Sequence, residues 1–416
     1  MTDFELEHWQ LSEHDGLDAH HMDYRVSSAL KDKCSTMQDV QEHLRANYTS
    51  NVAVEFNHVR DEAERLWLYH NYESMMAGEV TAAEKVKALQ LLLRAEQLEL
   101  FLQKRFATHK RYSSEGSEAL LVALNALIST ASEADPSSPG DAGVDSVVLG
   151  MPHRGRLASL VVLNDYPMRN LLHKVSGKND IPAEVTDRID DLPTHIAVSN
   201  TKKFSTATGS LKSKNKKVTF TMVHNPSHLE SQNAISMGKA KAKVDDTESQ
   251  DSRSVLNIQA HGDAAFCGQG VAYEALTLCQ LPKFDIGGSI HVITNNQVGF
   301  TTNSADGRSS DHSSDIVKSF GIPVVRINAA DGSTTPESLV RVCKFMVAYW
   351  KTFRKDILID MVGYRKHGHN EVDEPSFTQP EMYKKIRETP SLAVQYAERL
   401  VGEGVLDQAE VAAITE

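Results

Sequence analysis

Cysteine is scarce in this chain of 416 residues, which contains four: Cys34, Cys267, Cys279 and Cys343. They show neither Cys-x-x-Cys spacing nor the density of small secreted domains, which argues against a disulfide framework. This usage fits a reducing compartment in which the thiols are mostly buried. Long apolar runs are also absent. None approaches the ~20 residues of a membrane-spanning helix, so we expect no membrane association.

The first residues lack the features of targeting sequences. Asp3, Glu5 and Glu7 make the start of the chain too acidic for a mitochondrial transit peptide, and no apolar signal core follows. The sequence therefore indicates either a cytoplasmic protein or a chain without its native start.

An excess of positive charge is absent as well. There are 44 Lys and Arg residues against 56 Asp and Glu, a net charge of −12, which argues against a nucleic-acid partner. Hydrophobic residues make up 40% and charged residues 24% of the chain, as in globular proteins. The length exceeds one ordinary domain, so we expect a large core with a smaller appendage.

What the sequence does contain is an alternation of strand and helix patterns. An apolar helix is expected over residues 271–281, and a long helix begins at Thr335-Pro336, with proline at the first turn. Such alternation predicts an α/β fold with a parallel sheet and helices on both faces. We expect strands over residues 144–151, 217–223, 254–263, 289–296, 322–329 and 356–364.

Composition and periodicity divide the chain into four parts. Residues 1–50 are polar and read as a flexible segment, and residues 51–108 read as a helical module with a capping box at Thr81-Ala-Ala-Glu84. Residues 109–390 form the α/β domain. Residues 391–416 read as the helical start of a linker to a second domain.

Asp263 and Asn296 each close one of two strands that a helix connects. In a strand–helix–strand crossover the two strands are parallel, so both side chains reach the edge where open α/β sheets bind ligands. Mg²⁺ prefers oxygen ligands from one or two side chains together with phosphates and water. The pair, with the Val298 carbonyl, therefore predicts a magnesium diphosphate site. The alternative is a turn Asp and a strand-end Asn in another doubly wound fold.

Further polar residues follow the other predicted strands. We expect them to converge on one edge of the sheet, under a mobile loop over residues 302–314. They would combine three imidazoles and a guanidinium with the metal pair: His153, Arg154, His228, Asp263, Asn296 and His369.

From about Val52 onward the chain resembles a family. The segments 261–270 (HGDAAFCGQG) and 295–302 (NNQVGFTT) look like the thiamine diphosphate motif of the decarboxylase component of 2-oxoglutarate dehydrogenase and its 2-oxoadipate relative. Further blocks match in order: 110–116 (KRYSSEG), 150–157 (GMPHRGRL), 225–230 (NPSHLE) and 364–375 (YRKHGHNEVDEP).

The resemblance implies roles for individual residues. The metal ligands would be Asp263, Asn296 and the Val298 carbonyl. The substrate would meet His153 and His228, with Tyr112 and Ser114 shaping its pocket. The cofactor would contact Arg154, Gly262, Asp263, Ala264, Asn296, Val298 and His369.

The resemblance also implies a reaction and partners. The expected activity is oxidative decarboxylation of 2-oxoglutarate in the tricarboxylic acid cycle, with acyl transfer to the lipoyl group of a partner acyltransferase. A homodimer is expected, in the mitochondrial matrix of a eukaryote or the cytoplasm of a bacterium. Nothing here corresponds to the family's second α/β domain, which binds the aminopyrimidine, so this chain alone is expected to be inactive.

Two alternatives remain open. Tyr112 and Ser114 look more like the 2-oxoadipate branch, which acts in lysine and tryptophan degradation, because Ser in place of Leu leaves room for one more methylene. A methylene changes recognition by only about 1–3 kcal/mol, so overlapping use of both acids is expected. The other alternative is a non-catalytic half-enzyme that serves as a subunit of the complex.

Overall fold

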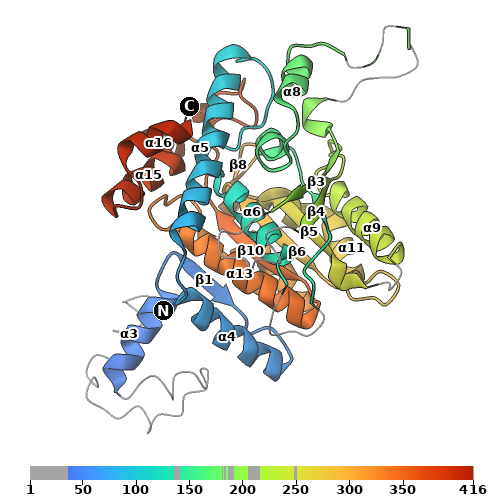
Figure 1. Ribbon diagram of the computed structural model, residues 1–416, viewed down its shortest axis with the longest axis vertical. Helices are drawn as coiled ribbons and strands as arrows, with labels where there is room; N and C mark the ends of the chain where they lie inside the picture. Colours follow the sequence, from blue (N-terminus) through green and yellow to red (C-terminus); the bar gives the residue numbers. More distant parts are fainter. Residues whose placement is uncertain are drawn as a thin grey trace.

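The computed structural model describes residues 36–134, 141–179, 181, 184–185, 192–204, 216–247 and 251–415. Within these residues the fold is built on one eight-stranded sheet in the order β1-β9-β10-β6-β5-β2-β4-β3 (Figure 1). The strands are β1 (Val52–Glu55), β2 (Ser146–Gly150), β3 (Val198–Lys203), β4 (Lys217–Met222), β5 (Val255–Gly262), β6 (Ser289–Asn295), β9 (Val324–Asn328) and β10 (Ile357–Val362).

The six central strands of this sheet are parallel, and each edge strand is antiparallel to its neighbour. β1 pairs with β9 at one edge, and β3 pairs with β4 at the other. The α/β fold with a mostly parallel sheet is therefore confirmed.

Helices cover both faces of the sheet. α4, α5, α6 and α13 pack on one face, and α9 and α11 lie on the other, at the right of Figure 1. The longer helices are α3 (Met37–Tyr48), α4 (Glu62–Met76), α5 (Ala82–Arg105), α6 (Ala119–Ser132), α8 (Met168–Val175), α9 (Ser231–Asp245), α11 (Gly270–Leu278), α13 (Thr335–Phe353), α14 (Pro380–Glu388), α15 (Leu392–Gly402) and α16 (Gln408–Thr415).

Successive residues of the strands divide between two cores, because side chains alternate across a sheet. In β10, Ile357 and Ile359 join the large core beneath α6 and α13, while Leu358 packs on the opposite face. β2 does the same with Val147 and Val148. Burial on both faces explains the near-continuous apolar runs that marked these strands in the sequence.

The N-terminal part differs from the expectation in two places. Met37–Tyr48 is a helix with a capping box between Thr36 and Asp39, although residues 1–50 were expected to be flexible. The remainder of that segment, residues 1–35, lies outside the described residues. Val52–Glu55 is an edge strand within the segment expected to be helical. The capping box at Thr81 and Glu84 is confirmed at the start of α5.

Elsewhere the differences are at element ends. α6 continues to Ser132, into the segment over residues 129–143 whose Ser, Pro, Gly and Asp content predicts a loop, and residues 135–140 lie outside the described residues. A short helix, α10 (Asp263–Gly268), begins directly at the end of β5, ahead of the expected helix. In the described part of the chain, no helix combines the length and apolarity needed to cross a membrane.

Glu118 immediately precedes α6 and is buried, which raises the pKa of its carboxyl to about 7. The native state then holds a proton that the unfolded chain releases, so this contribution to stability is full below about pH 4.5 and is lost as the pH rises through 7. Glu118→Gln should therefore raise the free energy of unfolding at pH 8 by on the order of 3 kcal/mol. At pH 4.5 the gain should vanish.

Urea denaturation at the two pH values measures this difference. Glu79→Gln, an exposed change in the turn before α5, is the matched control and should have no effect. An equal gain at both pH values would contradict the assignment.

Candidate active site

The crossover from β5 to β6 brings Asp263 and Asn296 together. The two strands are parallel neighbours, with Gly262 opposite Thr294, so both chains leave the sheet at the same edge. Asp263 opens α10, and Asn296 follows β6 directly. The strand–helix–strand arrangement predicted from the sequence is confirmed.

Both side chains line a cavity of about 90 Å³ at this edge of the sheet. β2 and β10 end at the same edge and add the segments that follow them. The predicted site residues in the wall are His153, Arg154, Gly262, Asp263, Ala264, Asn296, Val298 and His369.

The Asp263 carboxyl is 2% exposed. Burial raises its pKa to about 6, against the opposing effect of Arg308, whose Nη1 lies 3.9 Å from Oδ2. Arg308 belongs to the loop over residues 302–314, so that loop does lie over the site. Its mobility stays a prediction.

Residues 296–300 form a tight turn beside Asp263. The Asn296 Oδ1 accepts a hydrogen bond from the Val298 N–H at 3.3 Å, and Gln297 and Phe300 have left-handed backbones, with φ of 63° and 56°. The turn then pairs β7 (Val298–Gly299) with β8 (Thr302–Asn303). It thereby keeps the Asn296 amide and the Val298 backbone next to each other.

Gly299 allows this turn to approach α10. A Cβ at residue 299 would lie 2.7 Å from the Ala264 Cβ, closer than side chains pack. Gly299→Ala should push the turn away from Asp263 and weaken binding of Mg²⁺ with pyrophosphate by about 10–100-fold, as for other displaced supports of a metal site. Titration calorimetry measures this.

The compensating change is Ala264→Gly, which removes the other half of the clash. The double variant should recover most of the lost affinity while neither single change alters folding. Failure of the second change to restore binding would contradict the proposed close approach.

Two arginines supply positive charge to the cavity. Arg154 donates to the carbonyls of Ser113 at 3.2 Å and His369 at 2.9 Å, and burial lowers the pKa of its guanidinium to about 10. Arg365 is 3% exposed and donates to the Phe300 carbonyl at 3.0 Å. The Arg154 guanidinium remains cationic at neutral pH, and both arginines brace the walls through backbone carbonyls.

Two imidazoles and two aromatic rings form the adjoining wall. The ring centroids of Tyr112 and His153 are 4.0 Å apart, those of His153 and His369 are 5.5 Å apart, and Phe300 lies 5.1 Å from His369. Burial, aided by Arg154, lowers the pKa of His153 to about 3 and that of His369 to about 4. Both are therefore neutral at neutral pH, and each offers one donor and one acceptor.

A second cavity of about 620 Å³ adjoins the first. Tyr112, His153 and His369 line it, with His195 and Asn225 opposite. The larger cavity gives a molecule bound beside Asp263 and Asn296 room to extend away from these two residues.

Two predicted site residues lie elsewhere. His228 is exposed and lines neither cavity, although its neighbour Leu229 lines both. Ser114 is buried, and its hydroxyl and N–H bond the Glu99 carboxylate at 3.1 and 3.0 Å. The argument that Ser114 enlarges the pocket is therefore not supported, because its side chain faces Glu99.

The turn that carries Tyr112 depends on residues that the sequence analysis did not single out. The Glu371 carboxylate accepts hydrogen bonds from the N–H groups of Arg111, Tyr112 and Ser113 at 2.8, 3.3 and 2.7 Å. Glu371 and Arg365 lie inside the matched block over residues 364–375, so that block could have drawn attention to them. Arg308 had no comparable signal.

These residues fit a magnesium-bound diphosphate. No cluster of three or more His, Cys, Asp or Glu side chains suited to a metal occurs in the described ranges. A site with one buried carboxylate, one amide and a backbone carbonyl suits Mg²⁺ because phosphates and water complete its shell. The two cationic arginines suit the phosphates.

Comparison with known proteins agrees with this geometry. Residues 153–416 match the family model described as dehydrogenase E1 component. The chain is 37% identical to the probable 2-oxoadipate dehydrogenase complex component E1 homolog of Dictyostelium discoideum, over 92% of this chain and 40% of that protein. It is 36% identical to the mouse (Mus musculus) 2-oxoadipate dehydrogenase complex component E1, over 92% of this chain and 40% of that protein. It is 35% identical to the mitochondrial 2-oxoglutarate dehydrogenase of D. discoideum, over 90% of this chain and 35% of that protein.

The chain thus spans about two fifths of the length of the curated relatives it matches. The family comprises oxidoreductases that generally depend on thiamine diphosphate and work in multienzyme complexes with acyltransferases. On the match over residues 153–416, the chain belongs to the dehydrogenase E1 component family.

Proposed function

We propose that this chain is the diphosphate-binding part of an E1 decarboxylase acting on a 2-oxo dicarboxylic acid. The observation that carries the proposal is the meeting of Asp263 and Asn296 in one cavity with Arg154, His153 and His369. A metal pair, cationic walls and neutral imidazoles together suit a diphosphate cofactor with an acid substrate beside it.

The residues would divide the work as follows. Asp263, Asn296 and the Val298 carbonyl hold Mg²⁺, and Arg154 provides charge facing the phosphates. Gly262 and Ala264, at the start of α10, contribute backbone close to them. Thiamine diphosphate supplies the carbanion chemistry of decarboxylation when it is bound.

The substrate would lie in the wider cavity, next to His153 and His369. Neutral imidazoles there can donate hydrogen bonds to a carboxylate without an ion pair that decarboxylation would have to break. Tyr112 packs on His153 and fixes its ring. His228 could reach the substrate only by a rearrangement of the segment over residues 225–229.

The names of the relatives bear on the choice between the two acids. Two of the relatives cited above are named for 2-oxoadipate and one for 2-oxoglutarate, at nearly equal identity. The proposed substrate is 2-oxoadipate, in place of the 2-oxoglutarate expected from the sequence, with overlapping use of both acids. The proposed acceptor is the lipoyl group of an acyltransferase. The proposed setting is a homodimer in the mitochondrial matrix, and the name of one relative describes that protein as mitochondrial.

Ferricyanide reduction tests the proposal, measured with the assembled enzyme that contains this chain, thiamine diphosphate and Mg²⁺. Reduction should depend on the 2-oxo acid, with a larger kcat/KM for 2-oxoadipate than for 2-oxoglutarate and none for pyruvate. A larger kcat/KM for 2-oxoglutarate would support the 2-oxoglutarate dehydrogenase activity expected from the sequence. Cofactor binding without turnover of any 2-oxo acid would favour the non-catalytic subunit.

A further inference from the structure

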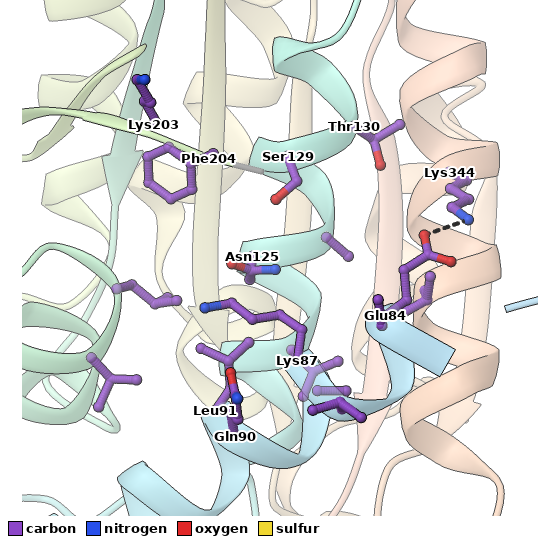
Figure 2. Close-up of a pocket in the computed structure, with 18 of the residues that line it drawn as sticks. Glu84, Lys87, Gln90, Leu91, Asn125, Ser129, Thr130, Lys203, Phe204 and Lys344 are labelled. Atoms are coloured by element: carbon purple, nitrogen blue, oxygen red, sulfur yellow. Dashed lines mark ion pairs between the residues drawn. The ribbon is translucent and has the colours of Figure 1, made fainter. Parts of the chain in front are cut away.

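A third cavity, separate from the candidate active site, lies between α5 and α6. Its volume is about 550 Å³, and it shares no lining residue with either cavity described above. One wall is the first half of α5, the other is α6, and residues 202–204 at the end of β3 close one side (Figure 2). This volume is within the range of small-molecule sites.

Lysines line this cavity, and two of them are neutralised by carboxylates. Lys344 pairs with Glu84 at 2.7 Å, as the dashed line in Figure 2 shows. Lys202 pairs with Asp165 at 2.6 Å. Across the described ranges, no carboxylate lies within ion-pairing distance of Lys87. Burial lowers the pKa of Lys87, and the charges of Arg94 and Lys202 add to that effect.

Hydrogen-bonding groups from α6 face the same space. The Ser129 hydroxyl is buried, with its residue 1% exposed, and has no hydrogen-bond partner in the described structure. A buried polar group without a partner costs stability, so an unpaired hydroxyl and an unpaired ammonium that line one cavity indicate a place for an acceptor. In Figure 2, Lys87 extends from α5 into the cavity below Asn125 and Ser129.

Much of the remaining wall is apolar, with Leu91, Val122, Ala126, Val162 and Phe204, while Gln90, Asn125 and Thr130 add polar groups. Of the described lysines in the wall, Lys87 is the one for which no partner is found, so a free phosphate or divalent anion would leave the apolar surface wet and half of its charge unmatched. An anion with a single charge and an apolar body matches both the unpaired lysine and the apolar part of the wall.

We propose that this cavity binds a small organic acid, whose carboxylate meets Lys87 and the Ser129 hydroxyl and whose apolar chain packs on α6 and Phe204. The site requires neither the metal pair nor the proposed decarboxylase activity. Its occupant is a second ligand, distinct in place and chemistry from a 2-oxo dicarboxylic acid in the active site.

Octanoate is the probe, and titration calorimetry with the 416-residue chain is the measurement. Lys87→Met keeps the length of the side chain and removes its charge, and it should weaken octanoate binding by about 10–100-fold, the usual effect of one hydrogen bond to a charged group. Octanamide, with the same body and no charge, should bind the two proteins equally and less tightly than octanoate binds the unchanged chain.

Three further variants separate the site from the fold. Lys104→Met, an exposed change on α5, should leave octanoate affinity unchanged. Ser129→Ala should weaken it by a smaller factor than Lys87→Met. Ala126→Met should fill the cavity and prevent binding while circular dichroism stays that of the unchanged protein.

The proposal is overturned by any of three results. These are no octanoate binding at millimolar concentrations, equal octanoate affinity with and without Lys87, and octanamide binding as tight as octanoate. Lys87→Met removes an unpaired charge, so its thermal unfolding temperature should not fall. If Lys87→Met both loses octanoate binding and unfolds, the octanoate affinities of Ser129→Ala and Ala126→Met decide the proposal instead.

Discussion

Replacing Asp263 with Asn should abolish Mg²⁺-dependent binding of pyrophosphate to this chain. The change keeps the size of the side chain and removes the one negative charge that the described wall of the cavity offers a metal. Loss of a residue that merely supports a metal ligand costs about 10–100-fold in affinity, so loss of the charged ligand should cost more than about 100-fold. Calorimetric titration with and without Mg²⁺ gives the result directly.

Pyrophosphate is the suitable probe because it needs only the diphosphate side of the site. Asp306→Asn, in the exposed loop over the cavity, is the matched control and should bind normally. An affinity for Mg²⁺-pyrophosphate that survives in Asp263→Asn would remove the metal assignment, and the proposed cofactor site with it.

Replacing Arg111 with Met should cause the largest loss of stability. Arg111 is 1% exposed, and its guanidinium bonds Glu99 at 2.8 Å and Glu115 at 3.3 Å. Burial raises the pKa of Glu99 even with Arg111 beside it. Removal of the arginine leaves that carboxylate buried without a cation, which costs about 3–5 kcal/mol in comparable pairs. Urea denaturation measures the loss.

The partner carboxylates should respond differently. Glu115 also bonds His367 and Lys366, each at 2.7 Å, and these hold its pKa below the ordinary value although burial acts in the opposite direction. Among the described residues Glu99 pairs with no other cation, so adding Glu99→Gln to Arg111→Met should recover part of the stability. Arg105→Met, at the exposed end of α5, is the control for a lost surface charge. A double variant no more stable than Arg111→Met would contradict the explanation.

Local sequence patterns were sufficient for the sheet and for the metal pair. β5 and β6 are buried strands of eight and seven residues joined by a helical connection, and this order predicts parallel strands whose ends meet. Asp263 and Asn296 come next in the chain, so their meeting followed from local order. Resemblance to known motifs then pointed to His153, Arg154 and His369, which do line the cavity.

Contacts between distant segments were not predictable in the same way. The resemblance made Ser114 a pocket residue, but its hydroxyl bonds the Glu99 carboxylate of α5 within the core. Arg308 reaches Asp263 from the residue after the short helix Ser304–Gly307, and only the folded chain reveals that contact. The edge strand β1 is four residues long and has one buried side chain, Val52, too little to distinguish it from the helices that follow.

Glu371, whose carboxylate bonds the backbone of residues 111–113, is translated long after those residues. The acceptor is made 260 residues after the first of its donors, an interval of about 13–50 s at a translation speed of ~5–20 residues per second. Until then the segment bearing Tyr112 is held by earlier contacts, such as those of Arg111 and Ser114 with Glu99, and not by Glu371. Under the proposed function, the pocket wall that carries Tyr112 is therefore complete only after residue 371 has been made.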